Sequence, residues 1–432
     1  MRLHHQMPLR ALLLFSLISS QLCKICEIGR EKYFHVNPLV STIINSKYTE
    51  GVQAANSLLS LRLVGIHNQS LDQRLIQQVQ DSVARKGSDL TSGQLALITL
   101  ALGACQNPKA LFRYDPHLVG QLEKKLQAEI ENMEAHEGNP LTNYYQFSTA
   151  VLALCLFNGT YSVTKVAQLL MPENKNYYFG GQFSVDTGAM AVLALSCMKK
   201  SVVNKQIQTD LKVINNNIQL LVKKILAEKK DNGLIGNTFS TGEAMQALFV
   251  SSNDYSEPGT VWNCQQTLDT VLKEVSQGAF SLPIAAAQVL PALLGKTYLD
   301  VNKDSSCVYD SGKFNVSTHQ PLSVTPTDAI SDISVHYSVK INETYSTTVT
   351  VKNGSVFLDV MKEAQKKNET LFGFTVTESS WGPYVTSVQG LKATNEDRSY
   401  WQLLSEDKPL SQGIGSYLVH DGENLEIRWS KY

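Results

Sequence analysis

The sequence lacks a strong net charge and lacks any long apolar run. Its 432 residues hold 38 Lys and Arg against 39 Asp and Glu, a formal net charge of −1. A nucleic-acid-binding protein needs a basic face, so this balance argues against a nucleic-acid partner. The one run that resembles a membrane span, residues 11–20, has ten residues. A spanning helix needs about 20, so we expect no membrane span.

The sequence also lacks the short motifs of common catalytic and cofactor sites. It contains no GxxxxGK motif followed by Ser or Thr, no strand-linked GxGxxG and no GxSxG. Nucleotide binding and a serine-hydrolase elbow therefore have no support. None of the nine histidines stands in an HxxxH or HExxH spacing. We therefore expect no metal held by protein side chains.

What is present at the N-terminus predicts secretion. Arg2 and Arg10 precede the short apolar run, which is the pattern of a signal peptide over residues 1–23. A buried first helix is the alternative. Asn-x-Ser/Thr triplets agree with a secreted, extracellular glycoprotein, although chance triplets in a Ser- and Thr-rich chain are an alternative. They lie at Asn68, Asn158, Asn315, Asn342, Asn353 and Asn368.

Seven cysteines are an awkward number for a secreted protein. Cleavage after Cys23 would leave six, enough for three disulfides. Six cysteines allow about 15 pairings, and the residues alone do not choose among them.

Before about residue 310 the chain predicts paired helices. Six segments rich in Leu, Ala and small residues are apolar on nearly every face, which is typical of helices buried all round. They cover residues 52–65, 93–105, 147–159, 185–197, 240–252 and 283–295. More polar, amphipathic helices lie between them, such as 71–86 and 117–133. This repeat favours a closed α6/α6 barrel over residues 24–310, with an open solenoid as the alternative.

After about residue 330 the composition shifts to β-branched and aromatic residues. Residues 333–341 and 345–353 alternate like paired strands, and 355–368 predicts one amphipathic helix. Strand-like pieces follow at 371–379, 383–390, 415–422 and 424–430. We expect a small α+β, β-rich domain over 331–432. The Ser-, Thr- and Pro-rich residues 311–330 read as a glycosylated linker.

Two acidic residues open inner helices and raise the question of catalysis. Helical barrels can host glycoside hydrolases, which use two carboxyl groups. Asp186 also fits a helix N-cap, and Glu243 fits the N3 position of a capping box after Ser240. We therefore expect no enzyme activity and keep a glycan-processing hydrolase as the alternative function.

Polar and aromatic residues, uncharged except for Asp186, recur near the starts of the inner helices, which ring one mouth of a barrel. Amide and hydroxyl groups gathered there suit a large neutral ligand with many amides. They are Gln94, Thr142, Asn143, Tyr144, Tyr145, Asp186, Asn237, Gln246 and Gln288.

Several long blocks resemble one family. Residues 183–197, 232–248 and 285–301, and the small-domain blocks 379–390 and 399–417, resemble the cobalamin-binding transport proteins. This family comprises transcobalamin, intrinsic factor and haptocorrin. NPLTNYYQFS and NKNYYFGGQFSVDTGAM are closest to its haptocorrin branch. The resemblance covers the mature chain and implies one corrinoid held between barrel and small domain.

The resemblance also implies specific pairings and contacts. The disulfides would be Cys26–Cys264, Cys105–Cys307 and Cys155–Cys197. The cobalamin contacts would come from the barrel and from the small domain, as two sets. They are Gln94, Thr142, Tyr145, Asp186, Asn237, Gln246 and Gln288, with Val385, Thr386, Ser387, Trp401, Leu403, Gly413 and Tyr417.

The same resemblance predicts how the cargo is held. In transcobalamin a histidine before the SVDT motif binds cobalt, whereas this chain has Gln182 and Phe183 there. We therefore expect cobalamin and related corrinoids as cargo, without a histidine ligand and without catalysis. The ordinary pKa of Asp186 predicts that affinity changes little until about pH 4. We expect a monomer, and the sequence names no receptor.

Overall fold

The computed structural model describes residues 26–46, 51–66, 68–104, 117–179, 181–205, 208–252, 262–301, 331–379, 382–395, 397–410 and 412–431. The predicted signal peptide and linker lie outside these residues, as do Cys105, Cys307 and Asn315. The domain bounds at these segments therefore stay predictions.

Six inner helices form a closed ring, which confirms the predicted α6/α6 barrel. Each packs against the next in chain order, and the last packs against the first. In α3 every residue except Gln53 is buried, as expected for a helix surrounded by others. The ring consists of α3 (Gly51–Val64), α5 (Ser92–Gly103), α8 (Tyr144–Leu156), α10 (Val185–Lys205), α12 (Thr241–Val250) and α14 (Pro283–Leu293).

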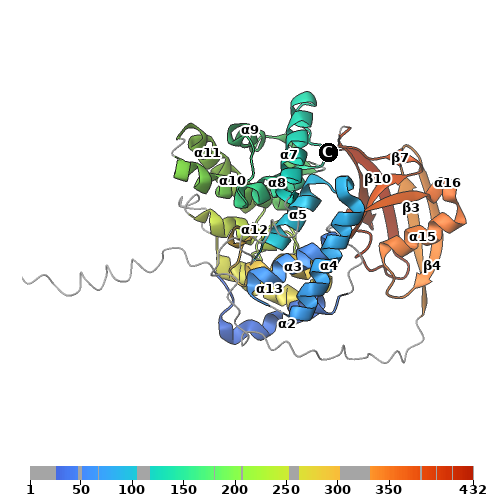
Figure 1. Cartoon of the computed structure of the whole chain (residues 1–432). Helices are drawn as coiled ribbons and strands as arrows, with labels where there is room; N and C mark the ends of the chain where they lie inside the picture. The colour runs from blue at the N-terminus through green and yellow to red at the C-terminus, as the bar shows by residue number, and fades with distance from the viewer. Residues whose placement is uncertain are drawn as a thin grey trace, which may run out of the picture.

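Amphipathic helices cover the outside of this ring (Figure 1). In α7, for example, Leu118, Leu122 and Leu126 recur at helical spacing on the buried face. The outer helices are α2 (Asn37–Ile44), α4 (Gln69–Lys86), α7 (Leu118–Ala135), α9 (Val163–Leu169), α11 (Gln208–Ala227) and α13 (Cys264–Ser276). Short connections are η1 (Arg30–Val36), η2 (Gly87–Asp89), η3 (Lys175–Tyr177), η5 (Tyr298–Asp300), β1 (Tyr178–Phe179) and β2 (Gln182–Phe183).

The small domain is a separate orange-to-red lobe beside the barrel (Figure 1). One sheet has the order β4-β3-β10-β8-β9, in which only the β10–β3 pair is parallel, and a second has the order β5-β6-β7. The first contains β3 (Asp332–Lys340), β4 (Thr344–Lys352), β8 (Ser399–Ser405), β9 (Lys408–Pro409) and β10 (Asn424–Lys431). The second contains β5 (Phe374–Ser379), β6 (Gly382–Val388) and β7 (Leu391–Lys392), and the helices are α15 (Phe357–Lys367) and α16 (Glu369–Phe372).

The strands between β6 and β10 differ from the sequence-based expectation. Residues 415–422 contain no extended strand; Leu418 makes one isolated bridge to Val356. The backbone there caps the start of α15, because Phe357 N donates to Tyr417 O at 2.9 Å. The long strand between β7 and β10 is β8 instead, which pairs along its length with β10. The predicted strand at 415–422 was therefore wrong.

Two of the three disulfides implied by the family resemblance lie within the described residues, and both are formed. Cys155 and Cys197 join the inner helices α8 and α10, with Cα atoms 6.2 Å apart. Cys26 and Cys264 join the chain start to α13, with Cα atoms 6.0 Å apart. No helix of the described residues combines the length and apolar character that a membrane crossing requires.

Four of the predicted glycosylation sites are exposed: Asn158, Asn342, Asn353 and Asn368. Asn68 is half-buried and caps α4, since its Oδ1 accepts from Leu71 N at 3.1 Å. Asn368 caps α16 in the same way, at 3.0 Å from Leu371 N. These four asparagine side chains are accessible, as the attachment of a glycan requires.

Candidate functional site

A pocket of about 600 Å³ lies between the starts of the inner helices and the small domain. The barrel contributes residues from α3, α5, α8, α10, α12 and α14, and the small domain contributes Thr377, Tyr384, Thr386 and Asn395. Its volume is within the usual range for a small-molecule site. Both domains therefore build one cavity.

Direct hydrogen bonds hold the small domain against the rim of this pocket. Asn395, in the loop after β7, donates through Nδ2 to the carbonyl oxygens of Leu141, at 3.1 Å, and Thr142. Arg398 donates to Asn176 Oδ1 and to the carbonyl of Lys175, both at 3.4 Å. The loop thus bridges the two domains directly.

A buried acid supports the barrel side of the rim. Glu129 of α7 is 1% exposed, and it accepts from Thr142 Oγ1 at 2.6 Å and from Ser92 Oγ at 2.6 Å. Its second oxygen accepts from Thr142 N at 3.1 Å. Glu129 therefore fixes the starts of α5 and α8 relative to each other, a role that sequence patterns did not indicate.

Tyr145, Asp186 and Glu243 meet in the wall of the pocket, from three inner helices. Tyr145 OH donates to Glu243 Oε1 at 2.6 Å, and Glu243 is fully buried. Burial and the neighbouring Glu243 raise the pKa of Tyr145 well above its usual value, so this hydroxyl stays a donor.

Both carboxyl groups hold protons more tightly than usual. Burial raises the pKa of Asp186 to about 6. Burial, with the charge of Asp186, raises the pKa of Glu243 to about 8. The expectation that Asp186 titrates near pH 4 was therefore wrong, because it used the value of a solvated carboxyl.

The capping roles considered for these acids were also wrong. Ser184 caps α10, since its Oγ accepts from Thr187 N at 3.3 Å, and Asp186 is the second helical residue. At α12 the Ser240 side chain makes no N-cap hydrogen bond. Ser240 Oγ instead donates to Ile235 O at 3.1 Å, so no capping box involves Glu243. Both acids are thus available to the pocket.

The predicted barrel contacts line the pocket with one exception. Six do so: Gln94, Thr142, Tyr145, Asp186, Asn237 and Gln288. Gln246 instead lies buried behind the wall, where its Oε1 accepts from Tyr298 N at 3.0 Å. Two of the lining amides also shape helix starts: Gln94 completes a capping box with Thr91, and Asn237 Oδ1 accepts from Ser240 N at 2.9 Å.

Two further members of the polar cluster shape the start of α8 and its surroundings. Asn143 is the N-cap, since its Oδ1 accepts from Gln146 N at 2.9 Å. Tyr144 is fully buried, and its OH donates to Leu169 O at 2.8 Å. Tyr144 therefore belongs to the barrel core rather than to the pocket.

Of the small-domain residues implied by the resemblance, the pocket lining contains Thr386 alone. Val385 and Trp401, each 4% exposed, belong to the domain core, where Trp401 packs on Trp429. Leu403 is partly buried against that core. The remaining three bond within their own domain: Ser387 with Thr375, Gly413 through its carbonyl, and Tyr417 with Glu423. Their roles as ligand contacts stay predictions.

Sequence reasoning missed the small-domain residues that do line the pocket. Thr377 and Tyr384 lie on paired positions of β5 and β6, so they share one face of that sheet. The alternation of these strands was visible, but nothing in it indicated which face would meet the barrel. Glu243 was considered only for catalysis or capping.

The described pocket lining contains no histidine, lysine or arginine. Gln182 is exposed on the β1–β2 hairpin, and Phe183 packs on Tyr178 with ring centroids 5.8 Å apart. The described part of the chain also holds no group of three or more His, Cys, Asp or Glu side chains able to bind a metal ion.

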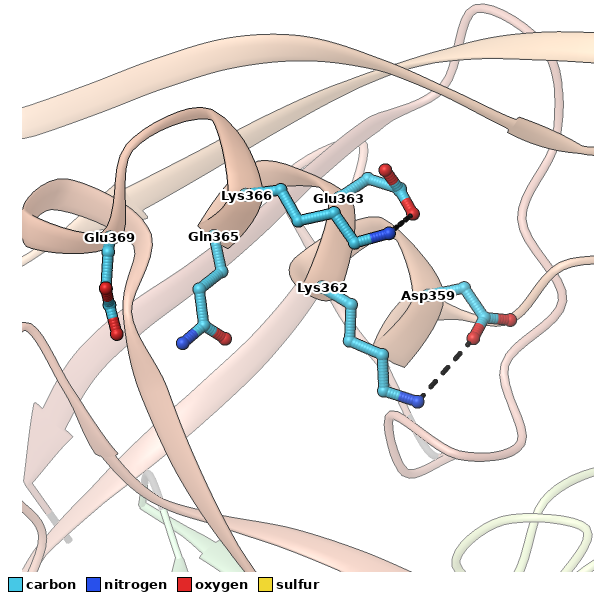
Figure 2. Close-up of a pocket in the computed structure, with 6 residues that line it drawn as sticks. All are labelled: Asp359, Lys362, Glu363, Gln365, Lys366 and Glu369. Atoms are coloured by element: carbon cyan, nitrogen blue, oxygen red, sulfur yellow. Dashed lines mark hydrogen bonds and ion pairs between the residues drawn. The ribbon is translucent and has the colours of Figure 1, made fainter.

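A second hollow lies on the outer face of α15 and α16 (Figure 2). Four of its charged side chains form two pairs: Lys366 lies 2.5 Å from Glu363, and Lys362 lies 3.9 Å from Asp359. These charged groups are largely solvated, so their ion pairs are weak. The surface therefore lacks the buried polar groups of the pocket between the domains.

Both parts of the chain match known family models. The family of eukaryotic cobalamin-binding proteins matches residues 8–328, and a domain of unknown function matches 354–431. The chain belongs to the eukaryotic cobalamin-binding protein family. Human Transcobalamin-1 is 65% identical over 100% of both chains, and human cobalamin binding intrinsic factor is 33% identical over 96% of both.

A solved member of the family has the same fold. The crystal structure of haptocorrin in complex with Cbi matches with a TM-score of 0.85 and 62% identity, covering 95% of this chain and 100% of that one. This likeness confirms the arrangement of a helical barrel followed by a β-rich domain. The expected membership of the cobalamin-binding transport proteins is confirmed as well.

Proposed function

We propose that this protein is a secreted glycoprotein carrier that binds cobalamin and related corrinoids in the pocket between its two domains. The observation that carries the proposal is a polar cavity built jointly by the barrel and the small domain in a member of the cobalamin-binding family. A corrin ring carries a rim of amides around an apolar face. The lining offers amides, hydroxyls and carboxyls for the rim, and Tyr384 and Phe239 for apolar surface.

The protein acts as a carrier and not as an enzyme. Family membership supports transport, and the relatives named above give the hydrolase alternative no support. Since Gln182 and Phe183 replace a histidine and the described lining has no histidine, the cobalt keeps its own axial ligands when bound. We propose that the carrier is a monomer.

The decisive experiment mixes the purified secreted protein with cyanocobalamin, and separately with cobinamide, and records visible spectra after gel filtration. We expect both corrinoids to co-elute with the protein in a one-to-one ratio. Aquocobalamin should bind without the spectral shift that imidazole on cobalt produces. A colourless protein peak with both corrinoids would refute the proposed function.

A further inference from the structure

Glu243 lies in the wall of the pocket between the two domains. It is the third residue of α12 and is fully buried. A carboxyl group rarely occupies such a place unless it is paired, because its desolvation is costly. Its one hydrogen bond of good geometry to the described residues comes from Tyr145, to Oε1 at 2.6 Å. That bond leaves the second oxygen to be explained.

Several buried polar atoms near that second oxygen have no hydrogen bond of good geometry. Glu243 Oε2 is buried without a hydrogen bond of good geometry, and so are both polar atoms of the Gln288 amide, which is 3% exposed and interacts with the Glu243 carboxyl group. Both side chains line the pocket. Buried polar atoms are normally satisfied, so an unpaired group facing a cavity indicates a ligand that completes it.

The surroundings determine the protonation of this site. Asp186 from α10, Tyr145 from α8 and Tyr298 from η5 are the titratable groups that interact with Glu243. The described lining has no basic side chain to balance two carboxylates. Burial raises the pKa of Glu243 to about 8 and that of Asp186 to about 6. At neutral pH Asp186 is therefore ionised and Glu243 carries a proton.

A protonated carboxyl is complementary to a primary carboxamide. Its O–H donates to the amide oxygen while its other oxygen accepts an amide N–H, and Gln288 can add a third hydrogen bond. The rim of a corrin ring presents carboxamides, which are neutral, and no carboxylates. We propose that Glu243 is a further ligand-binding residue, whose carboxylic acid, positioned by Tyr145, pairs with a carboxamide on the rim of the bound corrinoid. This inference rests on the proposed function.

The test measures cyanocobalamin dissociation between pH 7 and pH 9 for the full-length protein and three variants. In the wild type, dissociation should become about tenfold faster at pH 9, because Glu243 loses its donor proton there. Glu243→Gln keeps the shape and a donor but has no proton to lose, so its dissociation rate should stay flat from pH 7 to pH 9 and be slower than that of Glu243→Met. Glu243→Met lacks both groups and should release cobalamin about ten- to a hundredfold faster at pH 7.

Tyr145→Phe is the control for a merely structural role. It removes the hydroxyl that positions Glu243 but leaves the carboxyl, so its effect should be smaller than that of Glu243→Met. A flat wild-type profile, or equal rates for Tyr145→Phe and Glu243→Met, would overturn the inference. Thermal unfolding checks each variant, and the Glu243→Gln profile decides the matter if Glu243→Met fails to fold. A wild type that binds no cobalamin would refute the proposed function instead.

Discussion

Asp186 should have opposite effects on the stability of the empty protein and on ligand binding. Its pKa in the folded protein is about 6, above the ordinary 3.8. The folded state therefore binds more protons between these values, and its stability falls as pH rises through that window. Above pH 6 the buried charge remains a cost that the unfolded chain does not carry.

We therefore expect Asp186→Asn to raise the thermal midpoint of the ligand-free protein at pH 7 and to leave it unchanged below pH 4. The same variant should speed cobalamin dissociation by about tenfold at pH 7, since an amide replaces a charged acceptor. Calorimetry and stopped-flow absorbance measure the two quantities. A lower midpoint at pH 7 would contradict this prediction and favour a structural role.

Residue patterns could predict which polar groups gather at the mouth, but not what each one does there. Gln94 and Asn237 lie in the lining and also cap helix starts, whereas Gln246 turns behind the wall toward Tyr298. The role of each side chain depends on contacts with residues that are far away in the sequence. The partner of Glu243, Tyr145, is 98 residues away, so no local pattern revealed it.

At the scale of elements, a buried arginine completes the end of an inner helix. Arg62 of α3 is 5% exposed, and its Nη1 donates to the carbonyl oxygens of Ala101 at 2.8 Å and Ala104 at 3.1 Å. A helix leaves its last carbonyls without partners, and a cation near that end is also favourable for its dipole. Arg62 thus joins α3 to the C-terminus of α5.

Arg62→Met should lower the free energy of unfolding by roughly 1–3 kcal/mol, because it leaves buried carbonyl oxygens unpaired. Arg62→Lys should lose less. The matched control is Arg85→Met on the exposed face of α4, which should change stability by less than about 0.5 kcal/mol. Urea denaturation of the ligand-free protein measures all three. Equal losses for Arg62→Met and Arg85→Met would contradict the proposed role.

Elements buried all round were the most predictable. The six apolar segments begin within three residues of the observed helices, because no alternative placement could cover all their faces, although α10 extends beyond its predicted end to Lys205. The small domain was harder. Residues 415–422 alternate like a strand, yet their backbone bonds to the start of α15. Tertiary pairing, not local propensity, selected residues 399–405 for the sheet.

At the scale of the whole molecule, the loop after β7 should control how long the cargo is retained. Arg398 contacts Asn176 and Lys175 of the barrel and is absent from the pocket lining. When the barrel and the small domain are held together, the second domain's contact with cobalamin becomes effectively intramolecular. Cobalamin is therefore released more slowly. Weakening this bridge should therefore act through the opening of the two domains.

Arg398→Ala should speed cobalamin dissociation by about two- to tenfold, as expected for the loss of one or two modest hydrogen bonds. Association should change little. Arg428→Ala is the control: this arginine belongs to the same domain and pairs with Glu426 of its own strand, 2.5 Å away. Stopped-flow exchange against excess free cobalamin measures both. Identical dissociation rates for the two variants would exclude a bridging role.

The closed ring of inner helices has a consequence for how the protein is made. Helix α14 packs against α3, so the two ends of the ring meet only after more than two hundred intervening residues have been synthesised. Until then α3 and the most recently synthesised inner helix each lack one of their two ring neighbours and expose apolar surface. Contacts between such distant segments also form slowly. Biogenesis of this carrier should therefore depend on chaperones until its last inner helix emerges from the ribosome.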